Sequence, residues 1–517
     1  MNKKFSLSFL SACALLSTNQ LRSDYSYCCD KSYAFGQTHL SQRPQGNYYH
    51  TVMMGTADKT HVFGNDENYI NFNLTLGLRS NFDECELGQY FFTRKGPIVV
   101  GPNGNNVDII NLNLGLANNY QGNALLCPQI NTALAELDFY AGFDKWLEGS
   151  WIRVRAPFVK TRWQPCLRTA TSEAGAPFYP EGFAYPTGNI GVVYHDLADA
   201  LQENKSFSLI PGLEAGRFAC NQSLYGLSDL HFEIGYDYFR RERGNIGIAL
   251  IGAWGTGQPN ATKCNQFIFP PSYGSQCSSQ FGVAFRGQYQ IFNNSTDNKR
   301  ITIYSDLRVV HLLEGYTKRL LGLSSNEKTA FNQYLILDRY TATGTYLGAE
   351  RAANLLNKKV KVSTAAMLEF TIMSQILKDD WDFSLGYNLW YRSKECVQAC
   401  DNRLGNGHDL YTIKGNSTIN DDYTYSKIDS DVSILGTPVA DTNLDNIKTA
   451  AFREGDIVTC VAENPETYSS LLFAYIGHNF SETWLNPYLG LGGNIEFGRG
   501  NTALSTWGLY VKGGISY

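Results

Sequence analysis

The stretch that decides the fold is Trp507 to Tyr517, which reads WGLYVKGGISY and comes last in the sequence. Successive side chains of an extended chain point to opposite faces, so an apolar residue at every second position predicts a β-strand. Gly513 is the one break in the apolar row. The apolar face of this predicted strand consists of Trp507, Leu509, Val511, Ile515 and Tyr517.

The same alternation recurs along the whole chain. In Tyr69 to Leu78, Ile, Phe and Leu alternate with Asn, Thr and Gly, and Val107 to Leu116 shows a similar pattern. Soluble sandwiches favour charged residues on their wet face, whereas Asn and Gly fit the inside of a barrel. Besides these two and the terminal stretch, strands are predicted at Ile130–Phe143, Trp151–Val159, Leu230–Phe239, Ile246–Trp254, Phe281–Phe292, Ile301–Leu313, Ala366–Ile376, Trp381–Arg392, Leu471–Asn479 and Tyr488–Phe497.

The terminal stretch resembles the C-terminal strand of bacterial outer-membrane β-barrels, which ends on an aromatic residue after apolar residues at alternate positions. In that class the barrel-assembly machinery reads this strand, so the resemblance implies that Trp507, Leu509, Val511, Ile515 and Tyr517 form an assembly signal. One departure concerns the glycine expected upstream, because Lys512 occupies its position. The resemblance is to the class, and no single porin family is identified.

The connections between the predicted strands sort by length. Outer-membrane barrels have short periplasmic turns and long extracellular loops. Counting back from a periplasmic C-terminus, the short links fall at 144–150, 240–245, 293–300, 377–380 and 480–484, all on the periplasmic side. The other links are mostly long, above all those at 160–229, 314–365 and 393–470. Trp146, Trp381 and Trp484 lie at the periplasmic rim, as an aromatic girdle does.

These observations predict an all-β protein, a transmembrane antiparallel up-and-down barrel. The thirteen predicted strands are one short of an even number. A fourteenth strand in Tyr48 to Val62 gives fourteen, and a further pair in Leu87 to Val100 gives sixteen.

The start of the chain predicts export. Lys3 and Lys4 precede a short apolar run, which indicates a signal peptide over residues 1–23. Leu10 to Cys13 also matches a lipoprotein cleavage box, but ordinary removal is favoured. Residues 24–47 are predicted to form a periplasmic segment and residues 48–517 the barrel. A net charge of −5 argues against a nucleic-acid partner.

Charged residues on the inward faces are the candidate pore lining. The turn at 144–150 is expected to place Asp138 opposite Arg153 and Glu136 opposite Arg155. Two interpretations remain open: opposed charges that filter small ions, or a ladder of salt bridges that stiffens the wall. The candidates are Glu136, Asp138, Arg153, Arg155, Glu233, Arg286, Asp306, Arg308, Glu369 and Arg392.

Two loop stretches have helical patterns, Asp196 to Asn204 and Tyr346 to Lys359. Each is expected either to fold into the channel mouth as a constriction or to cap the rim. A fatty-acid channel, which also has fourteen strands, is disfavoured because the segment after the signal does not resemble the apolar hatch of that family.

The cysteines fit an oxidising compartment. The predicted local disulfides are Cys264–Cys277 and Cys396–Cys400, and Cys166 with Cys220 is a third candidate pair. Excluding Cys13, eleven cysteines remain. Because this number is odd, at least one cysteine has no partner within the chain. A disulfide to a neighbouring molecule is one role for this cysteine.

No catalytic, metal or cofactor site is predicted. His231 and Glu233 share an inward face, but a lone histidine in a barrel is more often a hydrogen-bonded wall residue. No nucleophile elbow, phosphate loop or zinc-protease motif occurs.

The sequence therefore predicts an outer-membrane, porin-like channel for passive diffusion of small hydrophilic solutes. The predicted partners are outer-membrane lipid, the barrel-assembly machinery and the solutes, with a homotrimer as a possible assembly. The alternative is a structural or adhesive barrel with disulfide-stabilised surface loops and no open pore.

Overall fold

The computed structural model describes residues 37–517 apart from a set of short gaps. The gaps are residues 41, 61–66, 83–86, 89, 92–95, 103–106, 177–190, 207–209, 219–220, 242, 258–267, 269, 277, 295, 324–330, 415–417, 420–424, 427–447, 449–450, 481–483 and 499–503. Within the described residues, no helix has both the length and the apolar character needed to cross a membrane.

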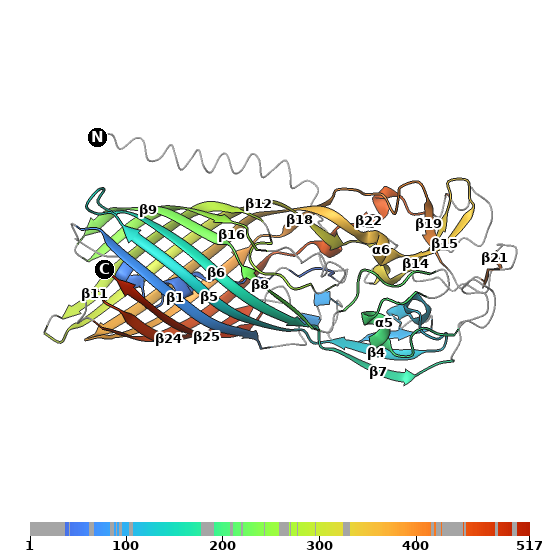
Figure 1. Ribbon diagram of the computed structural model, residues 1–517, viewed down its shortest axis with the longest axis horizontal. Coiled ribbons are helices and arrows are strands. Elements are labelled where there is room, and N and C mark those ends of the chain that lie inside the picture. The colour runs from blue at the N-terminus through green and yellow to red at the C-terminus, as the bar shows by residue number, and fades with distance from the viewer. Residues whose placement is uncertain are drawn as a thin grey trace.

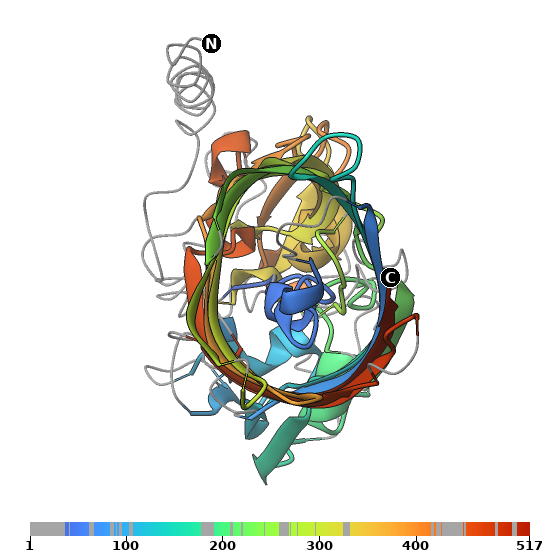
Figure 2. The same ribbon diagram turned by 90° about the vertical axis from the view of Figure 1, so that its left-hand side faces the viewer.

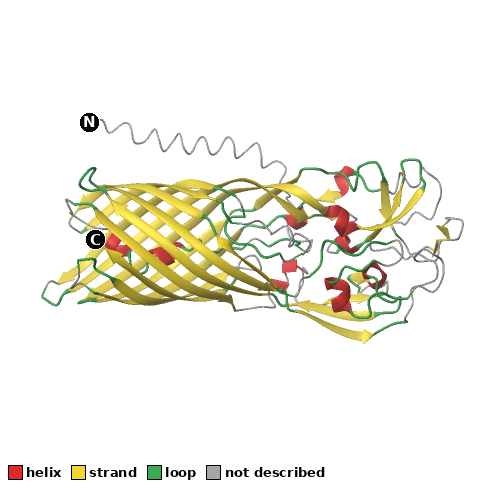
Figure 3. Ribbon diagram, viewed as in Figure 1, coloured by secondary structure: helices red, strands yellow, loops and turns green. Residues whose placement is uncertain are grey.

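A closed antiparallel barrel dominates the molecule (Figures 1 and 3). Of the fourteen described strands in the largest sheet, twelve form the ring, and β12 pairs with β16 to close it. The ring consists of β1 (Tyr69–Asn81), β5 (Gln129–Gly142), β6 (Ser150–Gln164), β9 (Leu230–Arg241), β10 (Gly244–Trp254), β11 (Gln280–Asn294), β12 (Lys299–Leu320), β16 (Asn357–Lys378), β17 (Trp381–Arg392), β23 (Thr467–Asn479), β24 (Tyr488–Gly498) and β25 (Thr506–Ser516).

The alternating sequence decides which side of the wall each residue occupies. On β1, Phe72 is 42 % exposed and Leu76 is 48 % exposed, whereas Asn71 and Asn73 are 0 % and 1 % exposed. The apolar face thus points outward and the polar face inward, the reverse of a soluble barrel. This arrangement suits a wall surrounded by lipid.

The terminal strand β25 completes the ring by pairing with β1 and β24. The five residues of the predicted assembly signal all lie exposed on its outer face, with Leu509 at 60 % and Tyr517 at 65 %. Lys512 points inward and is buried. The predicted strand and its outward face are therefore confirmed, while its reading by the assembly machinery stays a prediction.

The two ends of the barrel differ. Five short connections join neighbouring strands at the end that also holds the C-terminus, called here the turn end, and the long connections lie at the opposite loop end (Figure 1). Trp146, Trp381 and Trp484 are exposed at the turn end. The predicted sorting of short and long links is confirmed, and the periplasmic side of the turn end stays a prediction.

The long connections fold into a loop-end body with its own hydrophobic core, which includes Tyr120, Leu201, Leu337 and Leu356. Its strands are β2 (Ile98–Gly101), β3 (Ile109–Ile110), β4 (Gln121–Leu126), β7 (Leu167–Glu173), β8 (Gln222–Leu227), β13 (Gly322–Leu323), β14 (Ile336–Tyr340), β15 (Tyr346–Arg351), β18 (Glu395–Ala399), β19 (Leu410–Ile413), β20 (Thr418–Ile419), β21 (Tyr425–Ser426) and β22 (Ile457–Val458). The helices there are α5 (Leu197–Gln202) and α6 (Ala352–Leu356), with 3-10 turns η2 (Asn111–Leu114), η3 (Asn332–Tyr334), η4 (Glu454–Asp456) and η5 (Cys460–Ala462).

The predicted count of fourteen or sixteen strands is wrong, because three stretches are not barrel strands. Val107 to Leu116 forms only the short β3 and then η2, with Leu112 and Leu114 buried in the loop-end body. Tyr48 to Val62 holds two short helices, α2 (Tyr49–Met53) and α3 (Ala57–Thr60). Leu87 to Val100 adds β2 to a separate sheet. Without Val107 to Leu116, twelve of the thirteen predicted strands remain, and twelve is the even number that the ring has.

The two helical stretches pack in the loop-end body. Asp196 caps α5 by accepting a hydrogen bond from the Ala198 N–H at 2.6 Å. Tyr346 to Lys359 is helical only over α6, between β15 and β16. Both helices contribute buried residues to the hydrophobic core of this body.

One predicted disulfide is wrong. Cys396 lies on β18 and is disulfide-bonded, but Cys400 follows the same strand and carries a free, exposed thiol. A strand rises about 3.3 Å per residue, so cysteines four positions apart in one strand lie too far apart to bridge. The pairs Cys264–Cys277 and Cys166–Cys220 include residues outside the described part of the chain.

Candidate functional site

The inner face of the barrel is polar and highly charged. All ten candidate pore-lining residues face inward and are buried, and most form ion pairs with one another. The shortest nitrogen to oxygen distances are 2.8 Å for Arg308–Glu233, 2.9 Å for Arg308–Asp306, 3.4 Å for Arg153–Asp138, 3.5 Å for Arg155–Glu136, 3.9 Å for Arg155–Glu233, 2.5 Å for Arg286–Asp237 and 3.6 Å for Arg392–Glu395.

The predicted register of β5 and β6 is shifted by two residues. Asp138 lies opposite Arg155, and Arg153 lies opposite Tyr140. The ion pairs nonetheless join Arg153 to Asp138 and Arg155 to Glu136. They run diagonally, because long side chains reach the neighbour two positions along the facing strand.

A segment that is not part of the wall fills the barrel interior. Residues 42–60, called here the lumen segment, include α2 and α3, and Figure 2 shows these helices inside the ring. Thr38, just before the segment, donates to the Val461 carbonyl of η5 at the loop end. Asp58, near its end, accepts from Gln375 of β16 near the turn end at 3.2 Å. The chain therefore runs down the lumen from the loop end to the turn end.

This path corrects the predicted domain boundaries. Residues 24–47 are predicted to form a periplasmic segment, but those of them that the structure describes, 37–40 and 42–47, are mostly buried at the loop end or within the barrel. The first barrel strand begins at Tyr69 rather than at residue 48.

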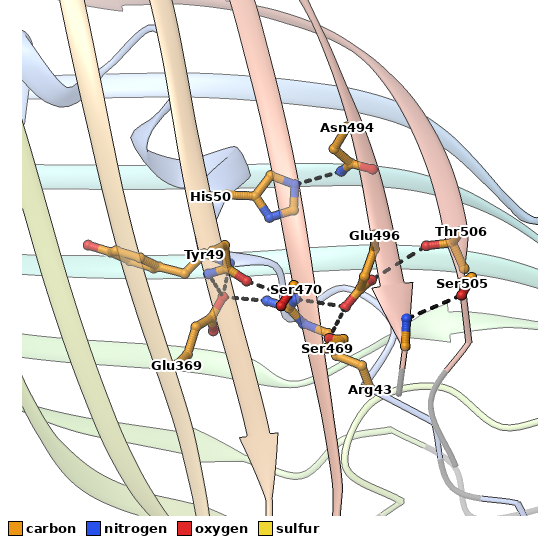
Figure 4. Close-up of polar contacts among 12 residues, drawn as sticks. Arg43, Tyr49, His50, Glu369, Ser469, Ser470, Asn494, Glu496, Ser505 and Thr506 are labelled. Atoms are coloured by element: carbon orange, nitrogen blue, oxygen red, sulfur yellow. Dashed lines mark hydrogen bonds and ion pairs between the residues drawn. The ribbon is translucent and has the colours of Figure 1, made fainter. Parts of the chain in front are cut away.

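Arg43 links the lumen segment to the wall through several polar contacts (Figure 4). Its guanidinium group pairs with Glu369 of β16 and, at 3.2 Å, with Glu496 of β24. It also donates to the side-chain oxygen of Asn388 at 3.0 Å. The ring of Trp390 lies 5.8 Å from the guanidinium carbon. One cation of the segment is thus shared by three strands of the wall.

The next residues continue these contacts. The Tyr49 N–H donates to Glu369 at 3.1 Å, and Arg153 donates to the Tyr49 hydroxyl at 3.1 Å. The His50 imidazole lies 2.7 Å from the side-chain amide nitrogen of Asn494 (Figure 4). The first two residues of α2 are therefore held by wall residues.

Lys512 holds the carboxyl end of α2. Its ammonium group donates to the carbonyl oxygens of Thr51 at 2.7 Å and Val52 at 3.2 Å. A cation at this end satisfies carbonyls that the helix leaves unpaired and complements the helix dipole. Lys512 occupies the position where the usual terminal strand has glycine. Its side chain contacts the lumen segment, so the unusual residue has a role in this structure.

Close packing accompanies the polar contacts. Val52, Met53, Met54 and Ala57 of the segment belong to one hydrophobic cluster with wall residues, among them Tyr475. Gly55 has a φ of +70°, and a Cβ built there would lie 2.5 Å from the Tyr475 ring. Only glycine fits both the backbone and the space at this position.

Residues 37–40 dock at the loop end beside a charged pair that joins Arg319 of β12 to Glu395 of β18. Arg319 donates to Glu395 at 2.7 Å. Burial raises the pKa of Glu395, but the neighbouring cations of Arg319 and Arg392 outweigh this effect and hold it at about 2. Burial, and after it the Arg319 cation, lowers the pKa of His39 to about 3. His39 is therefore docked in its neutral form.

Small cavities lie between the lumen segment and the wall. Two interior cavities, one beside Arg308 and Glu369 and one beside Pro44 and Arg392, each measure about 30 Å³. Each has room for about a single water molecule. A larger hollow of about 860 Å³ lies on the outer wall, lined by residues such as Tyr289 and Ile246 that face lipid.

Several residues of the site were not predicted. Glu496 and Lys512 lie on the polar faces of correctly predicted strands, so the alternation that identified the other inward charges also marks these two. Arg79, which forms an ion pair with Glu496, follows the predicted end of β1 by one residue. Arg43 and Tyr49 lie in a stretch whose sequence has neither strand nor helix periodicity. The surrounding wall supports this segment, so it needs no amphipathic face of its own.

The described residues place no candidate metal site beside the ion pairs. Within the described part of the chain, no group of three or more His, Cys, Asp or Glu side chains is placed to hold a metal ion. The arrangement is that of a charged, polar wall closed around a docked segment.

No family model and no curated relative matches the chain. Among solved structures, an outer membrane channel from Pseudomonas putida F1 is similar at 7 % identity and a TM-score of 0.37, covering 89 % of this chain and 98 % of that one. The translocator domain of the autotransporter NalP from Neisseria meningitidis shows 7 % identity and a TM-score of 0.27, with coverage of 89 % and 91 %. A mutant of the TodX monoaromatic hydrocarbon channel shows 9 % identity and a TM-score of 0.31, with coverage of 94 % and 98 %.

These scores are too low to support an argument about function. The fold itself is informative, because a closed ring of strands with an apolar outer belt and a polar lumen is the form in which strands cross a membrane. The chain forms a closed β-barrel of this kind, and no single family is identified.

Proposed function

We propose that the protein is an outer-membrane channel for small hydrophilic solutes and that the lumen segment closes it. The observation that carries the proposal is that a segment separate from the wall fills the lumen, largely through polar contacts. The segment contacts polar and charged wall residues, including Glu369, Asn494 and Lys512. Water can form hydrogen bonds with these groups as well as the segment does. Displacement of the segment exposes these polar groups together with the apolar wall residues of the shared cluster, and it leaves a passage whose charged and polar side chains water can solvate.

The proposal includes export through the signal peptide over residues 1–23, recognition by the assembly machinery and no enzymatic activity. The surroundings of two histidines of the barrel strands support the absence of a catalytic base. His231 is buried in the wall opposite Arg155, and the His311 ring lies 2.7 Å from the Ala365 carbonyl oxygen. The homotrimer and the disulfide-linked neighbour stay predictions.

The second candidate is a structural or adhesive barrel without an open pore. The observation that favours it is the loop-end body, which has a hydrophobic core of its own. The two candidates differ in a single property, which is whether displacement of the lumen segment lets solutes pass.

Replacing Gly55 with leucine is expected to open the channel. The new side chain collides with the Tyr475 ring, and the positive φ adds strain, so the docked segment is destabilised by about 2 kcal/mol or more. We expect an increase in conductance of at least tenfold in planar bilayers and faster swelling of sugar-loaded liposomes. The matched control is Gly455→Leu, because a Cβ at Gly455 meets no atom within 4 Å. If Gly55→Leu inserts but conducts no better than this control, the channel proposal fails.

Acidification is also expected to open the channel. The pKa of His39 is about 3 when docked, against about 6.5 when the residue is released into water. The released form therefore binds more protons between these values, and docking weakens as the pH falls below about 6.5. Each unit shifts the equilibrium toward release by up to about tenfold.

The measurement is conductance between pH 7 and pH 4. Wild-type conductance should rise over this range, and His39→Gln, which cannot take up a proton, should rise less steeply. An identical slope in the two proteins contradicts the role given to His39.

A further inference from the structure

The wall contacts of Arg43 form a site with a specific chemistry. Two carboxylates, one amide oxygen and one indole ring surround a single guanidinium group. All four wall residues, Glu369, Asn388, Trp390 and Glu496, are more than nine-tenths buried. An acidic cluster alone is no binding site, but here the lumen segment itself seats a cation in it.

The two carboxylates differ in what else they contact. Glu496 also pairs with Arg79 of β1 and accepts from Ser469 of β23, both of them wall residues. Glu369 accepts from Asn388 of the wall at 2.9 Å, and its other contacts are Arg43 and the Tyr49 N–H of the lumen segment. Displacement of the segment removes the contacts of Glu369 with Arg43 and Tyr49 and leaves Glu496 paired.

A buried carboxylate that has lost its cation is costly and attracts another positive group. The site has acceptors in several directions plus an aromatic ring. This geometry suits a planar guanidinium group, which presents a fork of five N–H donors and stacks on aromatic rings, better than a compact ammonium group. Arg43 thus occupies the position that a cationic solute takes once the lumen opens.

We propose that Glu369, Glu496, Asn388 and Trp390 form a binding site in the channel for small solutes that carry a guanidinium group, and that Arg43 is the tethered occupant that the solute replaces. This inference names the solute class of the channel and therefore rests on the proposed function.

The experiment uses the full chain with Arg43→Ala, which empties the site without removing the lumen segment. Binding of radiolabelled L-arginine is measured by equilibrium dialysis in detergent, with citrulline as the neutral analogue of the same shape and lysine as the ammonium analogue. We expect arginine to bind at least tenfold tighter than either competitor. We also expect no measurable binding to the wild type at neutral pH, because Arg43 occupies the site.

The second variant adds Glu369→Gln to Arg43→Ala and should weaken arginine binding at least tenfold. The matched control adds Asp237→Asn to Arg43→Ala. This substitution removes one negative charge, as Glu369→Gln does, but from an inward carboxylate that already forms an ion pair with Arg286. That control should keep arginine affinity within about twofold. Equal binding of arginine, lysine and citrulline, or equal loss in both double variants, overturns the site.

A conductance measurement separates this inference from the proposed function. Arginine at millimolar concentration should reduce the current of Arg43→Ala, and citrulline should not. If arginine binds as expected but neither Arg43→Ala nor Gly55→Leu conducts, the site stands and the channel function fails. If both variants conduct and arginine neither binds nor blocks, the channel stands and the site is wrong.

Discussion

Arginine at two positions of the outer belt is expected to prevent insertion of the barrel. Leu491 and Leu509 lie on the neighbouring strands β24 and β25 and are 59 % and 60 % exposed on the outer face. An arginine near the bilayer midplane of such a barrel costs about 2–4 kcal/mol. Leu491 lies diagonally across from Leu509, because Gly493 is the residue that faces Leu509, so the two new cations also repel each other. Leu491→Arg with Leu509→Arg therefore removes much of the stability typical of a folded domain.

The measurement is folding into lipid vesicles followed by heat-modifiable migration on a detergent gel. The double variant should lose most of the folded band. The control is Tyr225→Arg on β8, an 80 % exposed residue on a strand outside the closed ring, which should fold as the wild type does. A double variant that folds normally would show that this face does not contact lipid.

Removing the lumen segment should produce the largest change in permeability. A chain that begins at residue 61 keeps all twelve described ring strands and their pairing, so we expect it to refold in detergent as a barrel. The lumen then contains water where α2 and α3 were. Liposomes with this shortened chain should swell at least tenfold faster in small sugars than liposomes with the full chain, and the rate should fall with solute size.

A chain that begins at residue 37 controls for the loss of the amino terminus, because it retains the lumen segment. Its swelling rate should stay close to that of the full chain. Fast swelling with both shortened chains would indicate that residues before 37, rather than the lumen segment, close the barrel.

The wall was largely predictable from the sequence. A period of two assigns every residue of a barrel strand to lipid or lumen, which is why Ile70 to Leu78 and the terminal stretch were placed correctly. The same rule placed the ten inward charges. The prediction failed at Val107 to Leu116, because alternation also arises where a short strand and a 3-10 turn pack into a separate hydrophobic core.

The occupant of the lumen was not predictable in the same way. Residues 42–60 mix polar, aromatic and small side chains, and their conformation depends on wall residues hundreds of positions away. The odd strand count suggested a missing strand at Tyr48 to Val62, where the structure has α2 and α3. Contacts such as Arg43 with Glu369 or Lys512 with Thr51 depend on the closed ring, and local sequence carries no trace of them.

Single-channel recording in planar bilayers, with the full chain and the chain that begins at residue 61 studied side by side, tests the central claim most directly. The account predicts rare or no openings for the full chain at neutral pH and frequent stepwise currents for the shortened chain. A shortened chain that inserts, shows heat-modifiable migration and never conducts would contradict it.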